Sequence, residues 1–342
     1  MGYPCAPRLH RLQRGGLAAT IMDWGATLLS LQVAVPGERT RRELLLALSE
    51  PAAYARQGQG QHLNATLGRY AGCIARSRFE LGGREYRLHG EGSHCFNGGR
   101  EGFDRRRFTF VDTRPSSCTL ALCSPDQDQG FPGTMELYVT YALHDDCTLS
   151  ISYTAKCDRP CYASITCAAA FNLSGCTSSV LDHALQLRAA ALVECDGEQV
   201  PTGSFTPLSQ APAFDFREGK KLGLDFMNDP RMQAVRGYDH AFLLAGGPDP
   251  GTPCARLISA DEKVTLELAT DYPCLQLCTC NQLHHGQELT AADGAILPNH
   301  AGVCLMPGFC PDAMHLPRPA TAAPVNPMRP LQRSIIYRIT CS

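Results

Sequence analysis

Several features that would assign the chain to common protein classes are missing from its sequence. Residues 1–20 contain Arg8, Arg11 and Arg14 but no apolar run after them, so neither a signal peptide nor a spanning helix is predicted there. Neither sign of charge is in excess, because 31 Lys and Arg face 33 Asp and Glu and leave a net charge of -2. This balance gives no attraction to nucleic-acid phosphates or anionic lipid. We therefore expect a cytoplasmic protein with no nucleic-acid and no membrane partner.

Cysteine is plentiful, but the spacing typical of metal sites is absent. None of the 18 cysteines forms a Cys-x-x-Cys pair; the nearest spacings, in strand-like or loop-like sequence, are Cys157/Cys161, Cys274/Cys278 and Cys278/Cys280. A chain of this length buries a core without disulfide staples, and free cysteines pack like small apolar residues. We therefore expect buried thiols in a reducing compartment and no metal site.

Helical periodicity is weak, and alternation of apolar and polar residues dominates. The best helix candidate is residues 49–57, where Ser49 is suited to cap the first turn. Alternating apolar positions predict a hairpin across the turn His144-Asp145-Asp146, with Leu137, Val139, Tyr141 and Leu143 on one strand and Leu149, Ile151, Tyr153 and Ala155 on the other. We predict an all-β fold, a large antiparallel β-sandwich, in a single domain of residues 1–342. The Pro- and Ala-rich residues 317–330 are interpreted as a surface loop.

Short motifs spread along nearly the whole chain resemble those of the aldose 1-epimerases, the galactose mutarotases. They include Trp24-Gly25-Ala26-Thr27, Gly68-Arg69-Tyr70-Ala71, Phe96-Asn97-Gly98-Gly99, Gly130-Phe131-Pro132-Gly133, Phe171-Asn172-Leu173-Ser174-Gly175, Gly237-Tyr238-Asp239-His240 and Pro311-Asp312-Ala313. Each motif is weak by itself, but their collinear order is specific, and the implied galactose mutarotase-like supersandwich agrees with the strand pattern.

The resemblance implies a reaction, a substrate class and a set of site residues. The family interconverts the α and β anomers of hexoses such as galactose and glucose, without a cofactor. A carboxylate takes the proton of the anomeric hydroxyl while a histidine protonates the ring oxygen, and the roles reverse after rotation at C1. Other polar residues hold the sugar hydroxyls. We expect a monomer or homodimer whose partner, if any, is a hexose.

The positions that should carry this chemistry hold other residues here. In the segment that resembles the family's Asn-Arg pair, Gly72 and Cys73 replace the sugar-binding side chains, and Asn97 stands in place of a binding histidine. Ala168 occupies the catalytic histidine position and Met306 the general-base position. Neither side chain exchanges a proton near neutral pH. No catalytic residue is therefore intact at the family positions.

Asp239 keeps its family identity, so Asp239 and Asn97 are the candidate substrate-binding residues. Three alternatives stay open for the missing acid and base. A shift in alignment would bring His94, or one histidine of the pair His284-His285, into the site. His240 is a surrogate acid if it faces the site, although neighbours on a strand point to opposite faces.

Other charged or reactive side chains have both a structural and a functional interpretation. Asp126 and Asp128 are interpreted first as turn residues and second as a displaced base. Arg69 is a structural arginine or a ligand-facing one. Cys73 is interpreted as packing rather than as a nucleophile. The run Arg105-Arg106-Arg107 is the only obvious anion-binding cluster, and a solvated turn explains it better.

Three hypotheses follow from these substitutions. The chain is an aldose 1-epimerase by family with little or no turnover, a carbohydrate-binding or regulatory paralogue without catalysis, or an epimerase whose acid and base have moved.

Overall fold

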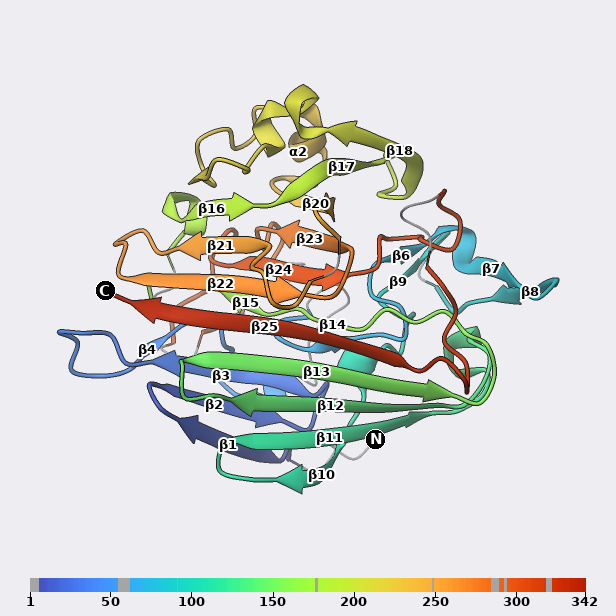
Figure 1. Cartoon of the computed structure of the whole chain (residues 1–342), viewed down its shortest axis with the longest axis horizontal. Coiled ribbons are helices and arrows are strands. Elements are labelled where there is room, and N and C mark those ends of the chain that lie inside the picture. Colours follow the sequence, from blue (N-terminus) through green and yellow to red (C-terminus); the bar gives the residue numbers. More distant parts are fainter. Residues whose placement is uncertain are drawn as a thin grey trace.

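Antiparallel strand pairs build most of the molecule (Figure 1). The computed structural model describes residues 6–54, 62–90, 92–175, 178–247, 249–283, 289–291, 294–317 and 322–342. Its largest sheet has nine strands and runs across Figure 1 from the bottom upward. Their spatial order is β10 (Thr109–Thr113), β11 (Ser117–Ser124), β12 (Met135–Leu143), β13 (Thr148–Cys157), β25 (Leu331–Cys341), β22 (Val264–Thr270), β21 (Ala255–Ile258), β16 (Ala184–Leu187) and β19 (Lys220–Lys221).

Two further sheets pack with the nine-stranded one. The six-stranded sheet has the order β15 (Ala170–Phe171), β24 (Val303–Gly308), β23 (Cys274–Cys278), β20 (Asp239–Leu244), β17 (Ala189–Cys195) and β18 (Pro201–Pro207). The four-stranded sheet consists of β1 (Leu9–Arg14), β2 (Leu17–Met22), β3 (Thr27–Val33) and β4 (Arg42–Glu43).

Small two-stranded ribbons and a few helical turns complete the described fold. The ribbons pair β14 (Thr166–Cys167) with β5 (Thr66–Leu67), β6 (Cys73–Ile74) with β9 (Cys95–Phe96), and β7 (Arg78–Leu81) with β8 (Arg84–Arg87). The α-helices are α1 (Pro51–Tyr54) and α2 (Pro230–Val235), and the 3₁₀ turns cover Ala75–Ser77, Phe103–Arg105, Asp128–Gly130, Val180–Asp182, Leu208–Gln210 and Pro212–Phe214. Residues 51–54 of the predicted helix are helical, and residues 55–57 lie outside the described residues.

The predicted hairpin is confirmed as β12 and β13, which pair from Met135 with Cys157 to Leu143 with Leu149. Alternate residues of both strands are buried, as the apolar pattern requires when one face of a sheet packs on a core. β25 follows residues 317–330 and pairs with both β13 and β22, so the chain after that segment closes the middle of the nine-stranded sheet.

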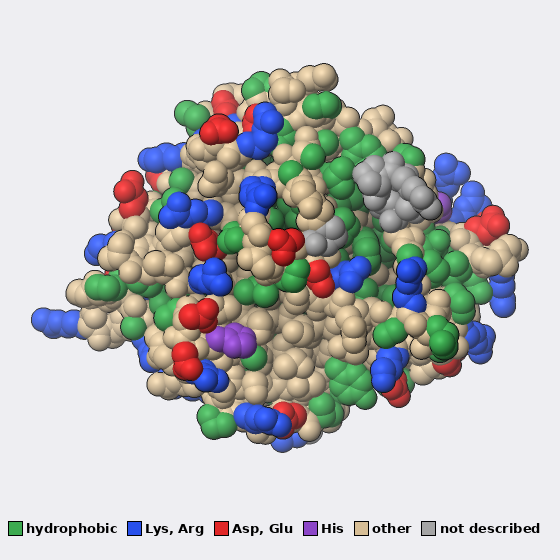
Figure 2. Space-filling model, in the orientation of Figure 1, with side chains coloured by type: hydrophobic (Ala, Val, Ile, Leu, Met, Phe, Trp, Pro, Cys, Tyr) green, Lys and Arg blue, Asp and Glu red, His purple; other side chains and the backbone are tan. Residues whose placement is uncertain are grey.

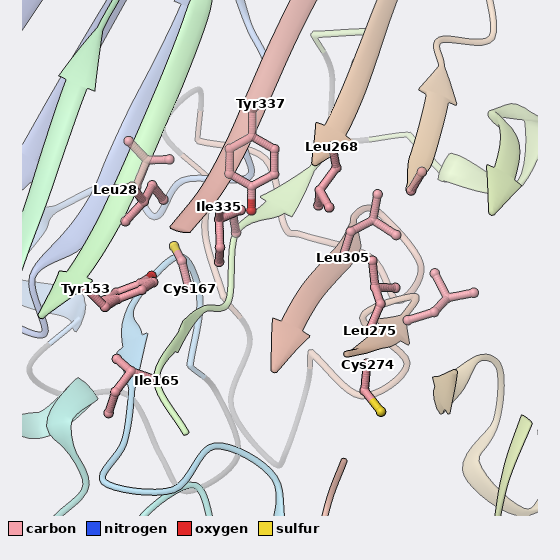
Figure 3. Close-up of a cluster of buried hydrophobic side chains, with 14 of the residues drawn as sticks. Leu28, Tyr153, Ile165, Cys167, Leu268, Cys274, Leu275, Leu305, Ile335 and Tyr337 are labelled. Carbon is pink, nitrogen blue, oxygen red and sulfur yellow. The ribbon is translucent and has the colours of Figure 1, made fainter. Parts of the chain in front are cut away.

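The core fills the space between the nine-stranded and six-stranded sheets (Figure 3). Leu268, Ile335 and Tyr337 point inward from β22 and β25, and Leu275 and Leu305 meet them from β23 and β24. All five are completely buried. Because successive side chains of a strand face opposite ways, the neighbours of Leu275 and Leu305 must lie on the other face of the six-stranded sheet.

Most cysteines are buried, in agreement with the prediction that they pack like small apolar residues. Buried thiols occur at Cys73, Cys95, Cys118, Cys157, Cys161, Cys167, Cys280 and Cys304. Cys274 and Cys310, by contrast, form a disulfide with 5.5 Å between their Cα atoms. The sequence did not predict this pair, because the two residues are separated by 36 positions and only the fold brings them together.

The face of the molecule in Figure 2 carries basic and acidic side chains mixed together, as the balanced composition predicts. Within the described part of the chain, no helix has the length and apolar character needed to cross a membrane.

Candidate functional site

The pairing of β20, β23 and β24 places the family positions on one face of the six-stranded sheet. Gln276 of β23 pairs directly with Met306 of β24, and Asp239 of β20 pairs with Cys278 of β23. Directly paired residues share a face, and so do residues two apart on one strand. All four side chains are therefore on the face opposite the main core, and each is partly exposed; Cys278 and Met306 also pack against a second buried apolar cluster. We call this the site face.

Ala168 and Met306 lie together at one end of the site face. Ala168 forms a small apolar cluster with Leu67 and Ala71, and Met306 packs against that cluster. Backbone hydrogen bonds fix Ala168, which donates its N–H to Ala65 and accepts from the N–H of Asn64, both at 2.9 Å. The two positions implied for the acid and the base thus adjoin one apolar cluster and present methyl, methylene and thioether groups to it.

Asp239 and Gln276 form a polar pair next to this cluster. The Gln276 side-chain amide donates to Asp239 Oδ1 at 2.7 Å. Burial raises the pKa of Asp239, and the hydrogen bond from Gln276 partly opposes that shift. The amide oxygen of Gln276 is buried and has no hydrogen-bond partner. Buried polar atoms without partners are uncommon, so this oxygen marks a place for a donor from a ligand or water.

The sequence analysis missed Gln276. One signal was available, because the alternation of buried and partly exposed residues in β23 puts Gln276 and Cys278 on the face opposite Leu275 and Leu277. The local sequence, however, does not indicate that β23 lies between the strands that carry Asp239 and Met306. That neighbourhood is a product of strand order.

The other candidate binding residues are held by local contacts. The side-chain oxygen of Asn97 accepts the Gly72 N–H at 3.0 Å, and the Asn97 N–H donates to the Gly72 carbonyl at 2.9 Å. Gly72 has φ +94°, a left-handed conformation that favours glycine. The Cys73 side chain is buried, and burial raises its pKa, so this thiol does not supply a reactive thiolate.

The histidines named as replacements have other partners. His240 Nδ1 accepts the backbone N–H of Asp239 at 3.0 Å, and the His240 ring is 8% exposed and packs 4.7 Å from that of Phe214. Burial, together with the nearby Arg231, lowers the pKa of His240 to about 4. His94 accepts the backbone N–H of Arg76 at 3.0 Å and lies 3.3 Å from Glu198. His284 and His285 lie outside the described residues.

Arg69 is a structural arginine, the first of the two interpretations given for it. Its guanidinium is buried and donates to the carbonyls of Pro132, Gly133, Ser124 and Pro125 at 2.9–3.0 Å, and also to the Ser124 hydroxyl. These bonds tie the segment after β11 to the strand-like segment that begins at Gly68.

Asp126 and Asp128 are also used within the turn after β11. Asp126 accepts the Gly133 N–H at 2.6 Å, and this bond lowers the pKa of Asp126. Asp128 accepts from the Ser124 hydroxyl and from Arg106, both at 2.5 Å. Both carboxylates therefore stabilise the turn, as their first interpretation predicted.

The run Arg105-Arg106-Arg107 is not the solvated turn that we expected. Arg105 lies 3.6 Å from Asp104, Arg106 2.5 Å from Asp128 and Arg107 3.4 Å from Asp23. Arg105 pairs with its sequence neighbour Asp104, whereas Arg106 and Arg107 pair with carboxylates from separate segments, which only the tertiary fold brings near.

Metal-binding clusters and hollows are other places where a site could form in the described parts of the chain. Within those residues no group of three His, Cys, Asp or Glu side chains is placed to hold a metal ion. A hollow of about 520 Å³ lies at the other sheet, lined by residues such as Lys221, Arg256 and Thr265. It includes none of the site-face residues.

The family is decided by comparison with known proteins. A family model described as aldose 1-epimerase matches residues 8–332. The chain belongs to the aldose 1-epimerase family. An aldose 1-epimerase of Escherichia coli K12 is 39% identical over 269 residues, covering 78% of this chain and 77% of that protein. A human galactose mutarotase is 31% identical over 310 residues, covering 90% of this chain and 87% of that protein.

Solved structures confirm the predicted fold of this aldose 1-epimerase family member. A GalM/aldose epimerase homologue from C. elegans superposes with a TM-score of 0.87 at 24% identity, covering 98% of this chain and 99% of the other. A galactose 1-epimerase from Lactobacillus acidophilus gives a TM-score of 0.81 at 23% identity, covering 96% and 93%. The antiparallel sheets described above are therefore those of a galactose mutarotase-like fold.

Proposed function

We propose that this chain is a hexose-binding member of the aldose 1-epimerase family whose epimerase activity is weak or absent. The observation that carries the proposal is the apolar cluster that includes Ala168 and packs against Met306, the residues at the two positions implied for proton transfer. Ring opening needs a base at the anomeric hydroxyl and an acid at the ring oxygen. Methyl and thioether groups serve neither purpose.

The size of the expected defect follows from general acid–base catalysis. One correctly placed acid or base contributes about 10²- to 10⁴-fold. The site face carries two titratable groups: Asp239, which is hydrogen-bonded to Gln276, the residue paired with Met306, and Cys278, whose thiol pKa is raised by burial. A single carboxylate without an opposing acid supplies half of the machinery at most, so we expect anomers to equilibrate near the spontaneous rate.

Sugar binding is supported by the polar pair rather than by the apolar cluster. The Asp239 carboxylate and the unpartnered oxygen of Gln276 are two acceptors on one partly exposed face. Neighbouring hydroxyls of a hexose are donors at suitable spacing, and a buried acceptor gains most from a partner when it otherwise has none.

Polarimetry tests the catalytic part of the proposal. Freshly dissolved α-galactose and α-glucose should lose optical rotation at the same rate with and without protein. Acceleration comparable to that of an ordinary mutarotase would contradict the proposal and favour a relocated acid and base.

Calorimetric titration tests the binding part. Galactose or glucose should give a measurable heat that the matched variant Asp239→Asn loses or weakens, since Asn keeps the shape of the side chain but not its charge. A flat trace with both sugars for the unmodified protein would remove hexose binding from the proposal.

A further inference from the structure

We propose that the site face takes hexosides, sugars whose anomeric oxygen carries an apolar group, in preference to free reducing hexoses. This inference rests on the proposed function, because it assumes that a sugar binds at Asp239 and Gln276. It names the chemical class of ligand that the same site now fits.

The polar end of the site, at Asp239 and Gln276, is suited to bind hydroxyl donors. Among the described side chains, Gln276 is the one that donates to the Asp239 carboxylate, and the Gln276 amide oxygen has no donor at all. A ligand that presents two neighbouring hydroxyls satisfies both acceptors. A saturated hydrocarbon leaves them unpaired, so the ligand must be polar at this end.

The opposite end of the site, at Met306, is suited to bind an apolar group. Met306 pairs directly with Gln276, and directly opposed side chains in an antiparallel sheet have Cβ atoms about 4.5–5.5 Å apart. From Met306 the surface continues as the apolar cluster of Leu67, Ala71 and Ala168. Acceptors and apolar groups therefore adjoin each other over a distance that a pyranose ring can span.

The anomeric end of the sugar is the end that meets the apolar cluster. In the reaction of the family, the groups at the positions of Ala168 and Met306 act on the ring oxygen and the anomeric hydroxyl. Against methyl and thioether groups a free anomeric hydroxyl loses its hydrogen bonds to water and gains none. An anomeric oxygen that bears an alkyl or aryl group has no such proton, and its substituent is buried favourably.

An alkyl or aryl group on the anomeric oxygen also removes the need for catalysis. A hexoside cannot open its ring without losing the group on the anomeric oxygen, so it does not interconvert between anomers. An acid and a base at Ala168 and Met306 would serve no purpose on such a ligand.

Calorimetric titration with methyl, ethyl, propyl and butyl β-D-galactopyranosides, with the matching glucosides and with free galactose, tests the inference. Each methylene that reaches the cluster should tighten binding about fourfold, because a buried methylene contributes roughly 0.8 kcal/mol and about 1.4 kcal/mol is tenfold. Free galactose should bind more weakly than every member of the series.

Variants identify the surface responsible. Met306→Gln keeps a long side chain but makes it polar, and should abolish the gain per methylene. Gln276→Leu should weaken all glycosides by a similar factor and leave the gain per methylene in place. Met328→Gln is the matched control, because Met328 is 93% exposed and does not belong to the site face.

The outcomes separate this inference from the proposed function. Equal affinity for galactose and all glycosides, or a gain per methylene that survives Met306→Gln, overturns the inference and leaves the proposed function standing. Rapid mutarotation by the unmodified protein overturns the proposed function. Absence of binding for every sugar and glycoside overturns the inference and the hexose-binding part of the proposed function together.

Discussion

Placing an acid and a base at the two positions implied for proton transfer is the most direct test of the proposed low epimerase activity. The change is Ala168→His together with Met306→Glu. The scaffold places the two residues near each other, since Ala168 belongs to one apolar cluster, Met306 packs against it, and each is fixed by strand pairing or backbone hydrogen bonds. If loss of the acid and base is the cause of low turnover, their return should raise it.

The magnitude follows from the contributions and from the surroundings. Acid and base are each worth about 10²- to 10⁴-fold, but groups that act together are strongly non-additive, so each single variant should stay within about tenfold of the unmodified protein. The positions that the resemblance implies for further sugar binding would still hold Gly72, Cys73 and Asn97. We therefore expect the double variant to exceed the unmodified protein by about 10²-fold, the lower end for one group.

The surroundings also predict a pH dependence. A carboxyl at position 306 would sit against Leu67, Ala71 and residue 168, and burial raises a carboxyl pKa. The base works only when it is deprotonated, so activity of the double variant should increase as pH rises through that raised pKa.

The assay is initial-rate polarimetry with α-galactose, accompanied by thermal unfolding to show that the added histidine does not disrupt the cluster. Overpacking at a site as buried as Ala168 costs about 1–3 kcal/mol, which a folded variant tolerates. A folded double variant no faster than the unmodified protein would refute the reasoning, because some other defect would then limit turnover.

Three further predictions concern stability. Burial lowers the pKa of both His183 and His240 to about 4, so on acidification the unfolded state takes up protons before the folded state does. The stabilisation from each histidine is therefore complete above about pH 6.5 and is lost toward pH 4, by about 3 kcal/mol. In urea titrations, the His183→Gln variant should lose less stability on acidification than the unmodified protein. Replacing Cys274 and Cys310 with Ser should lower the free energy of unfolding by about 4 kcal/mol, because the disulfide closes a loop of 36 residues. Since one core cluster joins residues from Leu12 to Ile339, we propose a single domain, and calorimetry should give one unfolding transition with equal calorimetric and van't Hoff enthalpies.

Strand identity was readable from the sequence where one face of a strand meets the core and the other meets water. The hairpin of β12 and β13 is the clearest case, because its period-two burial matches the apolar pattern residue by residue. The family was readable for a different reason. Motifs such as Gly237-Tyr238-Asp239-His240 keep their order although the residues implied for catalysis have changed.

The contacts that define the site face were not readable in the same way. Gln276 meets Asp239 and Met306 because β23 lies between β20 and β24, and strand order depends on packing of the whole chain. The ion pairs of Arg106 and Arg107 arise for the same reason, since their carboxylates come from separate segments. The apolar pattern of a strand indicates which face of the sheet a side chain takes, but it does not indicate which residue of a neighbouring strand that side chain contacts.

The polar groups next to the site face and the apolar cluster at Ala168 differ in how they are accommodated. Arg69 is buried and keeps a full set of acceptors, although a buried cation without them would be costly. The changes at Ala168 and Met306 instead leave an apolar cluster with no polar group stranded in it. On the site face, the Gln276 amide oxygen is buried and has no hydrogen-bond partner among the described residues.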